Sequence, residues 1–443
     1  MAQWRTDFHD WKQPHNVTLF EATMLADQHG NIVSGANPSG VAVDAFGRMR
    51  MSTPLTLFDS SHRYKDNGLW STSNTAGATV VHSTNQGYVN LNLPTTANEE
   101  IIRETTKVFA YQPGKSLLVL STFVPATPKA NLRQRIGYFG AENGIYFEID
   151  GTDAYLVERS YVTGSLVETR IAQSDWNMDN LLGPDVNVPG GIGPCPSRIL
   201  LDKSKAQIFW MDIEWLGLGT VRCGFVIDGK LIHCHSFHHA NLIASTYITT
   251  ACLPLRYEIK NTGTTASAST LGQVCSTVIS EGGYELRGLQ QAIGIPIQTP
   301  RTLGTSGTFY PVIGLRLKST RLDAIIILTA LSVMPISTGA FNWQIRAAGA
   351  ITGGTWTSAG TDSAVEYNIT GTSQSGGRIL ASGFFSASNQ GTTQIDILKE
   401  ALFKFQLERN GLTSAPYELT LVVASNGADD TVVASMDWEE VSR

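Results

Sequence analysis

The chain has 443 residues, of which only 16% are charged, and its formal net charge is −6 at pH 7. This length exceeds what a single core usually holds and indicates two or three domains. The negative charge and the scattered Lys and Arg residues argue against a nucleic-acid-binding protein, whereas few charges with many small and β-branched residues favour layered β-sheets.

Residues 1–64 are expected to form an N-terminal arm and docking segment. The first residues, MAQWRTDFHDW, contain no basic region followed by an apolar one. A secretory signal is therefore not expected, and the chain is expected to be made in the cytoplasm. Residues 1–36 show no clean periodicity, which is typical of an extended arm that is ordered only when it packs on something else.

Residues 44–64 read DAFGRMRMSTPLTLFDSSHRY. This string resembles a block of the form AFGRLRVSxPxTLFDSxxRY in virion structural proteins of tailed phages, especially marine and cyanobacterial ones, where it precedes β-sandwich domains. Met49 and Met51 stand where the pattern more often has Leu and Val. The matching residues are Asp44, Phe46, Gly47, Arg48, Arg50, Ser52, Pro54, Leu57, Phe58, Asp59, Ser60, Arg63 and Tyr64.

The resemblance implies a tail, short-fibre or capsid-decoration protein that resides in the virion. Its partners would be copies of itself, with a trimer favoured, and other phage virion proteins; no nucleic acid and no membrane insertion are expected. Symmetric particles favour closed oligomers. The residues expected to make these contacts are Trp4, Trp11, Phe46, Arg48, Arg50, Phe58 and Tyr64.

Residues 65–284 predict a β-sandwich, because apolar runs recur about every ten residues between turn signals. The expected strands are 78–82, 87–93, 103–111, 116–123, 135–139, 144–149, 154–160, 166–171, 243–252, 255–261 and 273–284, together with a meander over 206–237. All-β architecture is therefore the expected fold class.

The meander shows the clearest periodicity in the chain. In AQIFWMDIEW the apolar Phe209, Met211 and Ile213 alternate with more polar neighbours, which is the period of a strand. Asp228-Gly229 between two such runs predicts a type I′ hairpin. The ribbon resembles the sheet of concanavalin- or laminin-G-like jelly rolls, a likeness of fold that does not fix a function.

Residues 285–310 are expected to be a linker, because Gly and Pro recur through it. Residues 311–443 predict a second sandwich, jelly-roll or Ig-like, with a helical turn possible only at 394–399. Its expected strands are 312–318, 322–334, 340–348, 364–370, 378–386, 401–409, 417–424 and 432–438. The longest apolar run, 324–334, is too short to span a membrane. The strings GAFNWQIRAAGAITG and ASMDWEEV resemble the distal domain of the same phage proteins.

Two groups of residues raise the question of metal binding. The five cysteines are odd in number and form no CxxC pair, so reduced thiols are expected rather than a zinc knuckle or a disulfide scaffold. His233 and His235 are two apart on a predicted strand, so both rings should face the same way, which is a spacing that can chelate a metal. Since no third ligand is evident, packing against a sheet face is the other interpretation, and no cofactor is expected.

The acidic pairs give no complete catalytic set. A sandwich glycosidase needs two carboxylates across the sugar, and Asp212 with Glu214 lacks a third acid where Trp210 stands; the pair Glu148 and Asp150 is also incomplete. No nucleophile elbow, zinc-protease motif or phosphate loop occurs. We therefore assign no catalytic residue and do not expect the protein to be an enzyme. Two alternatives stay open: a module that recognises host glycan, and a polysaccharide-degrading enzyme. The tryptophans that a sugar-stacking platform could use are Trp210, Trp215, Trp343, Trp356 and Trp438.

Overall fold

The computed structural model describes residues 53–183, 194–285, 287–387, 393–396 and 404–442, and Thr53–Arg443 forms one compact unit. The described residues are β-structure in antiparallel sheets, and helix is confined there to short 3-10 turns such as η2, Gln173–Asp175. The predicted all-β fold of two sandwiches is confirmed. No helix among the described residues is long and apolar enough to cross a membrane.

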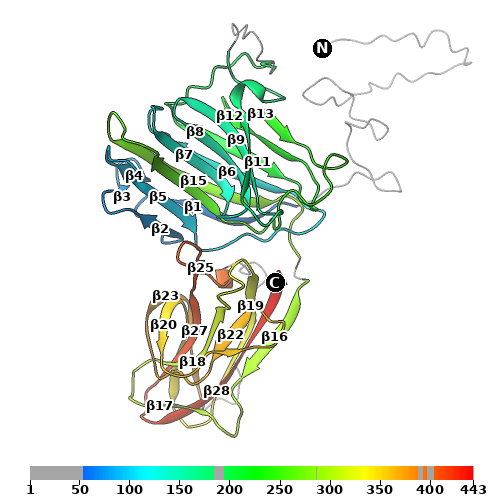
Figure 1. Ribbon diagram of the computed structural model, residues 1–443. Helices are drawn as coiled ribbons and strands as arrows, with labels where there is room; N and C mark the ends of the chain where they lie inside the picture. Colours follow the sequence, from blue (N-terminus) through cyan, green and yellow to red (C-terminus); the bar gives the residue numbers. More distant parts are fainter. Residues whose placement is uncertain (1–52, 184–193, 286, 388–392, 397–403, 443) are drawn as a thin grey trace, which may run out of the picture. The chain divides into compact units, whose positions relative to one another are not determined.

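The first sandwich consists of an eight-stranded and a seven-stranded sheet (Figure 1). The eight-stranded sheet runs β13 (Lys230–Phe237), β12 (Val221–Ile227), β11 (Gln207–Ile213), β6 (Leu117–Val124), β15 (Ser269–Ser280), β4 (Tyr88–Leu93) and β3 (Thr79–Ser83), with β1 (Leu55–Ser61) also on β15. The seven-stranded sheet runs β10 (Val167–Ala172), β9 (Asp153–Ser160), β8 (Gly144–Asp150), β7 (Leu132–Phe139), β14 (Leu255–Asn261), β5 (Glu100–Thr105) and β2 (Trp70–Asn74).

Alternating side chains build the core of this sandwich, as the meander predicted. Phe209, Met211 and Ile213 of β11 are at most 1% exposed and join one hydrophobic cluster from both sheets. The hairpin between β12 and β13 turns at Asp228 (φ 50°) and Gly229 (φ 73°). Both values are positive, which is what a type I′ turn requires.

Several segments of the first sandwich differ from expectation. The expected strand 103–111 ends at Thr105 of β5, and β2 (Trp70–Asn74) was not predicted. Leu55–Ser61, expected within the docking segment, is strand β1 and pairs with β15 from Leu55 opposite Ser280 to Ser61 opposite Cys275. Residues 243–252 form no strand although several of their apolar side chains are buried. There the Tyr247 N–H donates to the Gly217 carbonyl of a turn, so the segment packs as a loop against it.

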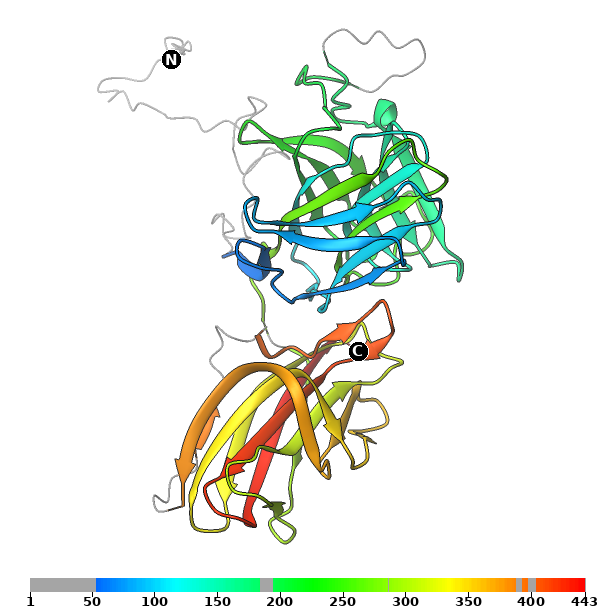
Figure 2. The same ribbon diagram turned by 90° about the vertical axis from the view of Figure 1, so that its left-hand side faces the viewer.

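The second sandwich has a five-stranded and a six-stranded sheet. The five-stranded sheet runs β16 (Leu289–Gly294), β28 (Asp430–Ser442), β19 (Ile325–Pro335) and β24 (Thr393–Asp396), with β17 (Arg301–Leu303) also on β28. The six-stranded sheet runs β21 (Thr357–Ser358), β22 (Val365–Asn368), β18 (Tyr310–Leu317), β27 (Glu418–Ser425), β20 (Ala340–Thr352) and β23 (Ser373–Ser386). Figure 2 shows the long strands β20 and β23 side by side, in yellow and orange.

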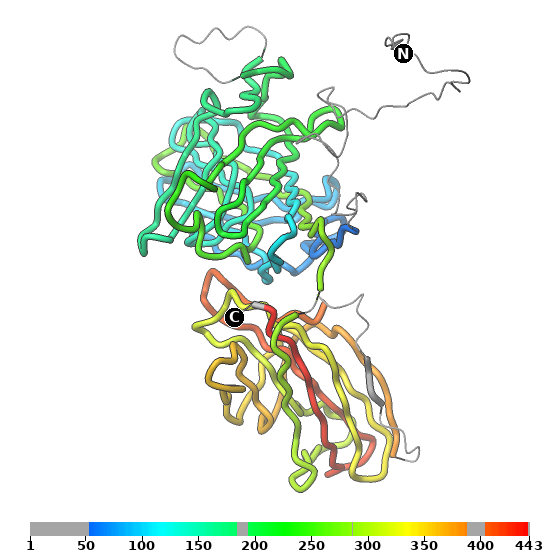
Figure 3. Tube along the Cα trace, turned by 90° about the vertical axis from the view of Figure 1, so that its right-hand side faces the viewer, coloured from blue at the N-terminus to red at the C-terminus, as the bar shows by residue number. Residues whose placement is uncertain are grey.

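The expected linker 285–310 is not devoid of regular structure, which corrects the sequence analysis. Its strands β16 and β17 both pair with β28, and the tube of Figure 3 shows the light-green β16 beside the red β28. Gly and Pro in 285–310 interrupt the strands but leave enough backbone N–H groups for pairing at a sheet edge.

Two expectations for the end of the chain were also wrong. Thr393–Asp396 is strand β24 rather than part of a helical turn. Residues 404–408 form no strand, and only the two-residue β25 (Arg409–Asn410) follows, paired with β26 (Ala415–Pro416). The reason is that this segment bonds to a loop of the first sandwich: the Gln406 side chain donates to the Val108 carbonyl at 2.8 Å, and the Arg409 N–H to the Thr106 carbonyl at 2.8 Å.

Candidate functional site

Buried charges cover the outer face of the seven-stranded sheet. Its strands alternate strictly, so that Gln134 and Ile136 of β7 face the core while Arg135 between them faces outward. Cross-strand register places opposite charges together, with Glu148 and Glu258 opposite Arg135 on the two neighbouring strands. We call this surface the charged face; its members are Glu104, Arg135, Glu148, Asp150, Arg159, Glu168, Arg170, Arg256 and Glu258.

Glu148 is the most deeply buried carboxylate of the charged face, with none of its side chain exposed. One oxygen accepts from Arg135 Nε at 2.5 Å and the other from Arg170 Nε at 2.7 Å. Arg170 also reaches Asp150 at 2.9 Å. Both oxygens of Glu148 are therefore occupied by guanidinium N–H groups, as a buried carboxylate requires.

Glu168 on the strand β10 is bound from three sides. Its Oε1 accepts from Arg159 Nη2 at 2.7 Å and from the Tyr146 hydroxyl at 2.8 Å, while Oε2 lies 3.2 Å from Arg135 Nη2. Burial opposes ionisation of Glu168, but the charge of Arg135 and the hydrogen bonds from Tyr146 and Arg159 outweigh it and hold its pKa below the ordinary value.

An aromatic floor supports these guanidinium groups. Phe139, Tyr146 and Val157 form a small buried cluster on the outer side of the sheet. Arg135 and Arg159 each lie 5.1 Å from the Tyr146 ring centroid, within the range of cation–π attraction. Burial of the Tyr146 hydroxyl raises its pKa. The charged face is thus a rigid layer of paired charges above packed rings.

This arrangement is unsuited to glycosidase chemistry. A general acid in such enzymes needs a carboxyl whose pKa is raised, and a nucleophile needs a free carboxylate oxygen. The pKa of Glu168 shifts in the opposite direction, and both oxygens of Glu148 are taken. Glu148 and Glu168 are each paired with two arginines.

The pair Asp212 and Glu214 on the other sheet takes part in local structural contacts. Asp212 is 7% exposed and pairs with Arg222 on the next strand. Glu214 is exposed, and its carboxylate accepts the Thr220 N–H at 3.2 Å, which closes the turn between β11 and β12.

His233 and His235 do not face the same way. A β-bulge between Cys223 and Gly224 places His235 opposite Cys223 and His233 opposite Gly224, and these two partners point to opposite faces. The His233 ring lies 5.9 Å from that of Trp210, and the His235 Nδ1 accepts the Asn177 N–H at 3.2 Å. Among the residues that the structure describes, no group of three or more His, Cys, Asp or Glu is arranged to hold a metal.

Of the neighbouring histidines, His239 forms an ion pair with Glu158. Its Nε2 lies 2.7 Å from Glu158 Oε2, its Nδ1 donates to the Gly219 carbonyl at 2.5 Å, and its ring stacks on Tyr247 at 3.9 Å. Burial opposes protonation, but the bonds to Glu158 and Gly219 raise the pKa of His239. Its contribution to stability is therefore complete below the unfolded pKa of about 6.5 and is lost as pH rises through the folded pKa.

The expected contact residues fall into two groups. Trp4, Trp11, Phe46, Arg48 and Arg50 lie outside the described residues. Phe58 is 7% exposed and packs on Trp70 and Phe109, so it serves the core rather than a surface, because β1 turns that side inward.

Tyr64, by contrast, is 79% exposed, beside Arg63. Another residue of the same block, Ser60, is buried and accepts the indole N–H of Trp70 at 2.9 Å. In the described part of the block, residues 53–64, Phe58 and Ser60 are therefore buried in the core, while Tyr64 at its end is exposed.

The tryptophans considered for sugar stacking are mostly inside the protein. Trp210, Trp343 and Trp438 are 5%, 5% and 1% exposed. Trp215 is half-buried against Tyr111, and the ring of the half-buried Trp356 is covered by Arg316 at 4.2 Å. An open aromatic platform is not formed by these five residues.

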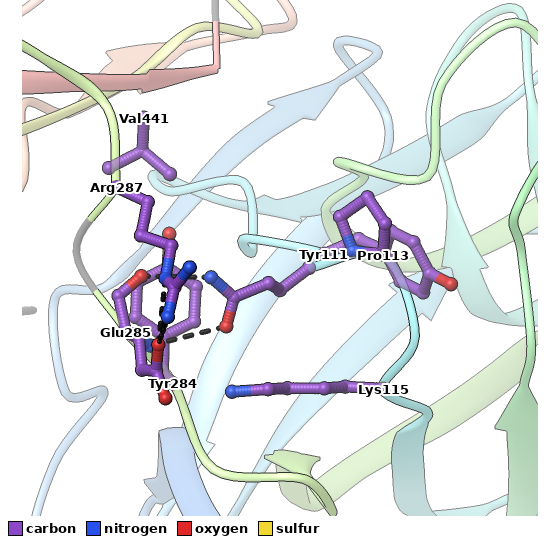
Figure 4. A pocket seen from close by; sticks show the side chains of 8 residues that line it. Tyr111, Pro113, Lys115, Tyr284, Glu285, Arg287 and Val441 are labelled. Carbon is purple, nitrogen blue, oxygen red and sulfur yellow. Dashed lines mark hydrogen bonds and ion pairs between the residues drawn. The ribbon is translucent and has the colours of Figure 1, made fainter.

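A cavity of about 460 Å³ lies beside the loop that precedes β6 (Figure 4). Glu285 is the one carboxylate in its lining and is paired with Arg287. The Gln112 side chain fixes this segment by donating to the Glu285 carbonyl at 2.9 Å. The lining offers no second acid for acid–base catalysis; it consists of Tyr111, Gln112, Pro113, Lys115, Tyr284, Glu285, Arg287 and Val441.

Comparison with known proteins gives no family. No family model matches the chain, and no curated protein matches it. Among solved structures, a protein of unknown function from Shewanella oneidensis MR-1 is similar over 54% of this chain and 91% of its own, with 13% identity and a TM-score of 0.33.

Two further solved structures illustrate the range of similar proteins. A carbohydrate esterase from the Shiga toxin-encoding bacteriophage phi24B is similar over 52% of this chain and 99% of its own, at 12% identity and a TM-score of 0.29. The β-glucanase of Bacillus licheniformis is similar over 50% of this chain and 96% of its own, at 13% identity and a TM-score of 0.31. At these values the similarities carry no argument about activity.

Proposed function

We propose that the chain is a structural protein of a tailed phage particle, placed in the tail, a short fibre or the capsid decoration. It acts by associating with copies of itself and by docking to other virion proteins. The resemblance of residues 44–64 to a block of such proteins is the sequence basis for this proposal.

The observation that carries the proposal is the way this block enters the first sandwich. Strand β1 pairs with β15 from Leu55 to Ser61, and Phe58 and Ser60 are anchored in the core. A load applied to the residues before β1 would therefore pull along a row of hydrogen bonds rather than on a loose loop. Such a joint suits a segment that ties a subunit to a larger assembly.

The chemistry of the described surface supports binding over turnover. The carboxylates of the charged face are neutralised by arginines, and the acids of the meander stabilise a cross-strand pair and a turn. Contact surfaces, in contrast, need only area and complementarity, and a standard interface buries about 1,600 Å² in total. We therefore assign no catalytic residue and no cofactor.

Deletion of residues 1–36 tests the proposed docking role. The truncated chain is expected to fold with an unchanged thermal unfolding temperature but to be absent from assembled particles. Substitution of the exposed Leu200 by Ala is the matched control and is expected to assemble normally. Normal incorporation of the truncated chain would exclude residues 1–36 as the docking element.

A second measurement addresses polysaccharide degradation. Purified chain is expected to leave the viscosity of host polysaccharide unchanged. A fall in viscosity that grows with protein concentration would contradict the assignment of a purely structural role.

A further inference from the structure

Strand β23 lies at one edge of its sheet. It is the last strand of the six-stranded sheet and pairs only with β20 among the described residues. At 14 residues it is long, since strands usually have 3–10 residues. A long edge strand presents a row of unpaired N–H and C=O groups that can pair with another chain.

The side chains of β23 do not protect this edge. Phe384 is 78% exposed and Ile379 is 53% exposed. Arg378 is the one charged residue of the strand, and its guanidinium is bonded to Glu408 at 2.6 Å. Lysines and prolines, which commonly shield edges, are absent from β23, and the strand is irregular at a bulge near Leu380 and at Gly376 and Gly377, where φ is positive.

Phe384 is held in its exposed position by its neighbour. Phe385 lies opposite Phe341, and the two rings stack at 5.1 Å in the core of the second sandwich. Because successive residues of a strand face opposite sides, anchoring Phe385 directs Phe384 outward, opposite Asn342. Removing a phenylalanine of this exposure from water is worth about 2 kcal/mol.

We propose that β23 is a self-association edge at which a second copy of this chain adds its own β23 in antiparallel orientation. This inference rests on the self-association in the proposed function and names the surface that performs it. Because both copies contribute the same edge, the contact closes after two copies, and any trimer contact would use another surface.

The sequence of β23 fits its own copy. A two-fold axis at Phe384 sets this residue against its counterpart, Ser382 against Ser386 and Gly383 against Phe385. A cross-strand aromatic pair adds about 0.5–1.5 kcal/mol beyond the area buried. The segment from Ile379 to Ser386 is uncharged, and the two copies of Arg378 would lie about 40 Å apart, too far to repel.

The test uses the full-length chain in solution, measured by light scattering after size-exclusion chromatography. The wild-type chain is expected at twice the single-chain mass, and Phe384→Asp at the single-chain mass, with dissociation at least 100-fold more favourable. Leu242→Asp is the matched control, because Leu242 is 70% exposed but lies in a loop of the first sandwich, and it is expected to match the wild type. A single-chain mass for the wild type, or an unchanged mass for Phe384→Asp, would overturn the proposal.

Hydrogen exchange gives a second readout that needs no substitution. Amides of residues 382–386, which face their own copies in this register, are expected to exchange slowly in concentrated protein and faster on dilution, while those of β20 stay constant. Exchange that does not depend on concentration would also overturn the proposal. Both measurements are made without phage particles, so a particle that lacks this chain would contradict the proposed function and leave the edge contact standing.

Discussion

The charged face makes a quantitative prediction at Glu148. In Glu148→Gln the side chain keeps its volume but loses its charge, and Arg135 and Arg170 lose a partner at 2.5 Å each. Breaking a buried ion pair by removing one member costs about 3–5 kcal/mol. Arg135 keeps Glu168 and Glu258, and Arg170 is 35% exposed, so water and other carboxylates compensate in part. We therefore expect the lower end, a loss of about 3 kcal/mol in the free energy of unfolding.

The measurement is equilibrium urea denaturation of the full-length chain, with Glu285→Gln as the control. Glu285 also pairs with an arginine, but the two side chains are 58% and 75% exposed, so no measurable change is expected for this variant. The comparison isolates burial, because both substitutions remove the same charge from the same kind of pair. Equal effects of the two substitutions would refute the reasoning.

Three smaller predictions concern single residues. Burial lowers the pKa of His62 and of His235 to about 4. Both histidines are therefore protonated at a higher pH in the unfolded chain than in the folded one, and the free energy of unfolding should fall by about 3 kcal/mol for each histidine as pH drops from about 6.5 to 4. A flat pH profile of the unfolding free energy would speak against this. Gly229→Ala should cost about 1 kcal/mol in thermal unfolding because φ is positive there, whereas Gly360→Ala, without that conformation, should not; equal losses would disprove a backbone cause. Ser60→Ala should cost about 1–3 kcal/mol by leaving a buried indole N–H without an acceptor, and unchanged urea denaturation would show that the hydrogen bond contributes little.

Local periodicity was sufficient to predict much of the fold. The alternation around Phe209 and Met211 predicted the buried side of β11, and Asp228-Gly229 predicted the hairpin, because both depend on residues that are neighbours in sequence. The prediction that His233 and His235 face the same way was wrong because one extra residue in β13 creates a β-bulge. The residue types in this segment do not indicate that bulge.

The charged face could not be predicted in the same way. Glu148 is visible in the sequence as a polar residue between Phe147 and Ile149, which is a pattern typical of an exposed edge, and Arg135 follows the polar Gln134. Their burial depends on register, because Glu258 comes from a strand distant in sequence and meets Arg135 only after β14 pairs with β7. Strands β16 and β17 were missed for a related reason: their pairing partner, β28, is the last strand of the chain.

The central claim is that this chain is part of a virion and works through contacts rather than catalysis. The most direct test is negative-stain imaging of purified phage particles labelled with an antibody to the chain. We predict label at one repeated position on the particle, in the tail, at a short fibre or on the capsid surface. Particles without label, from lysates in which the antibody detects the free chain, would contradict the claim.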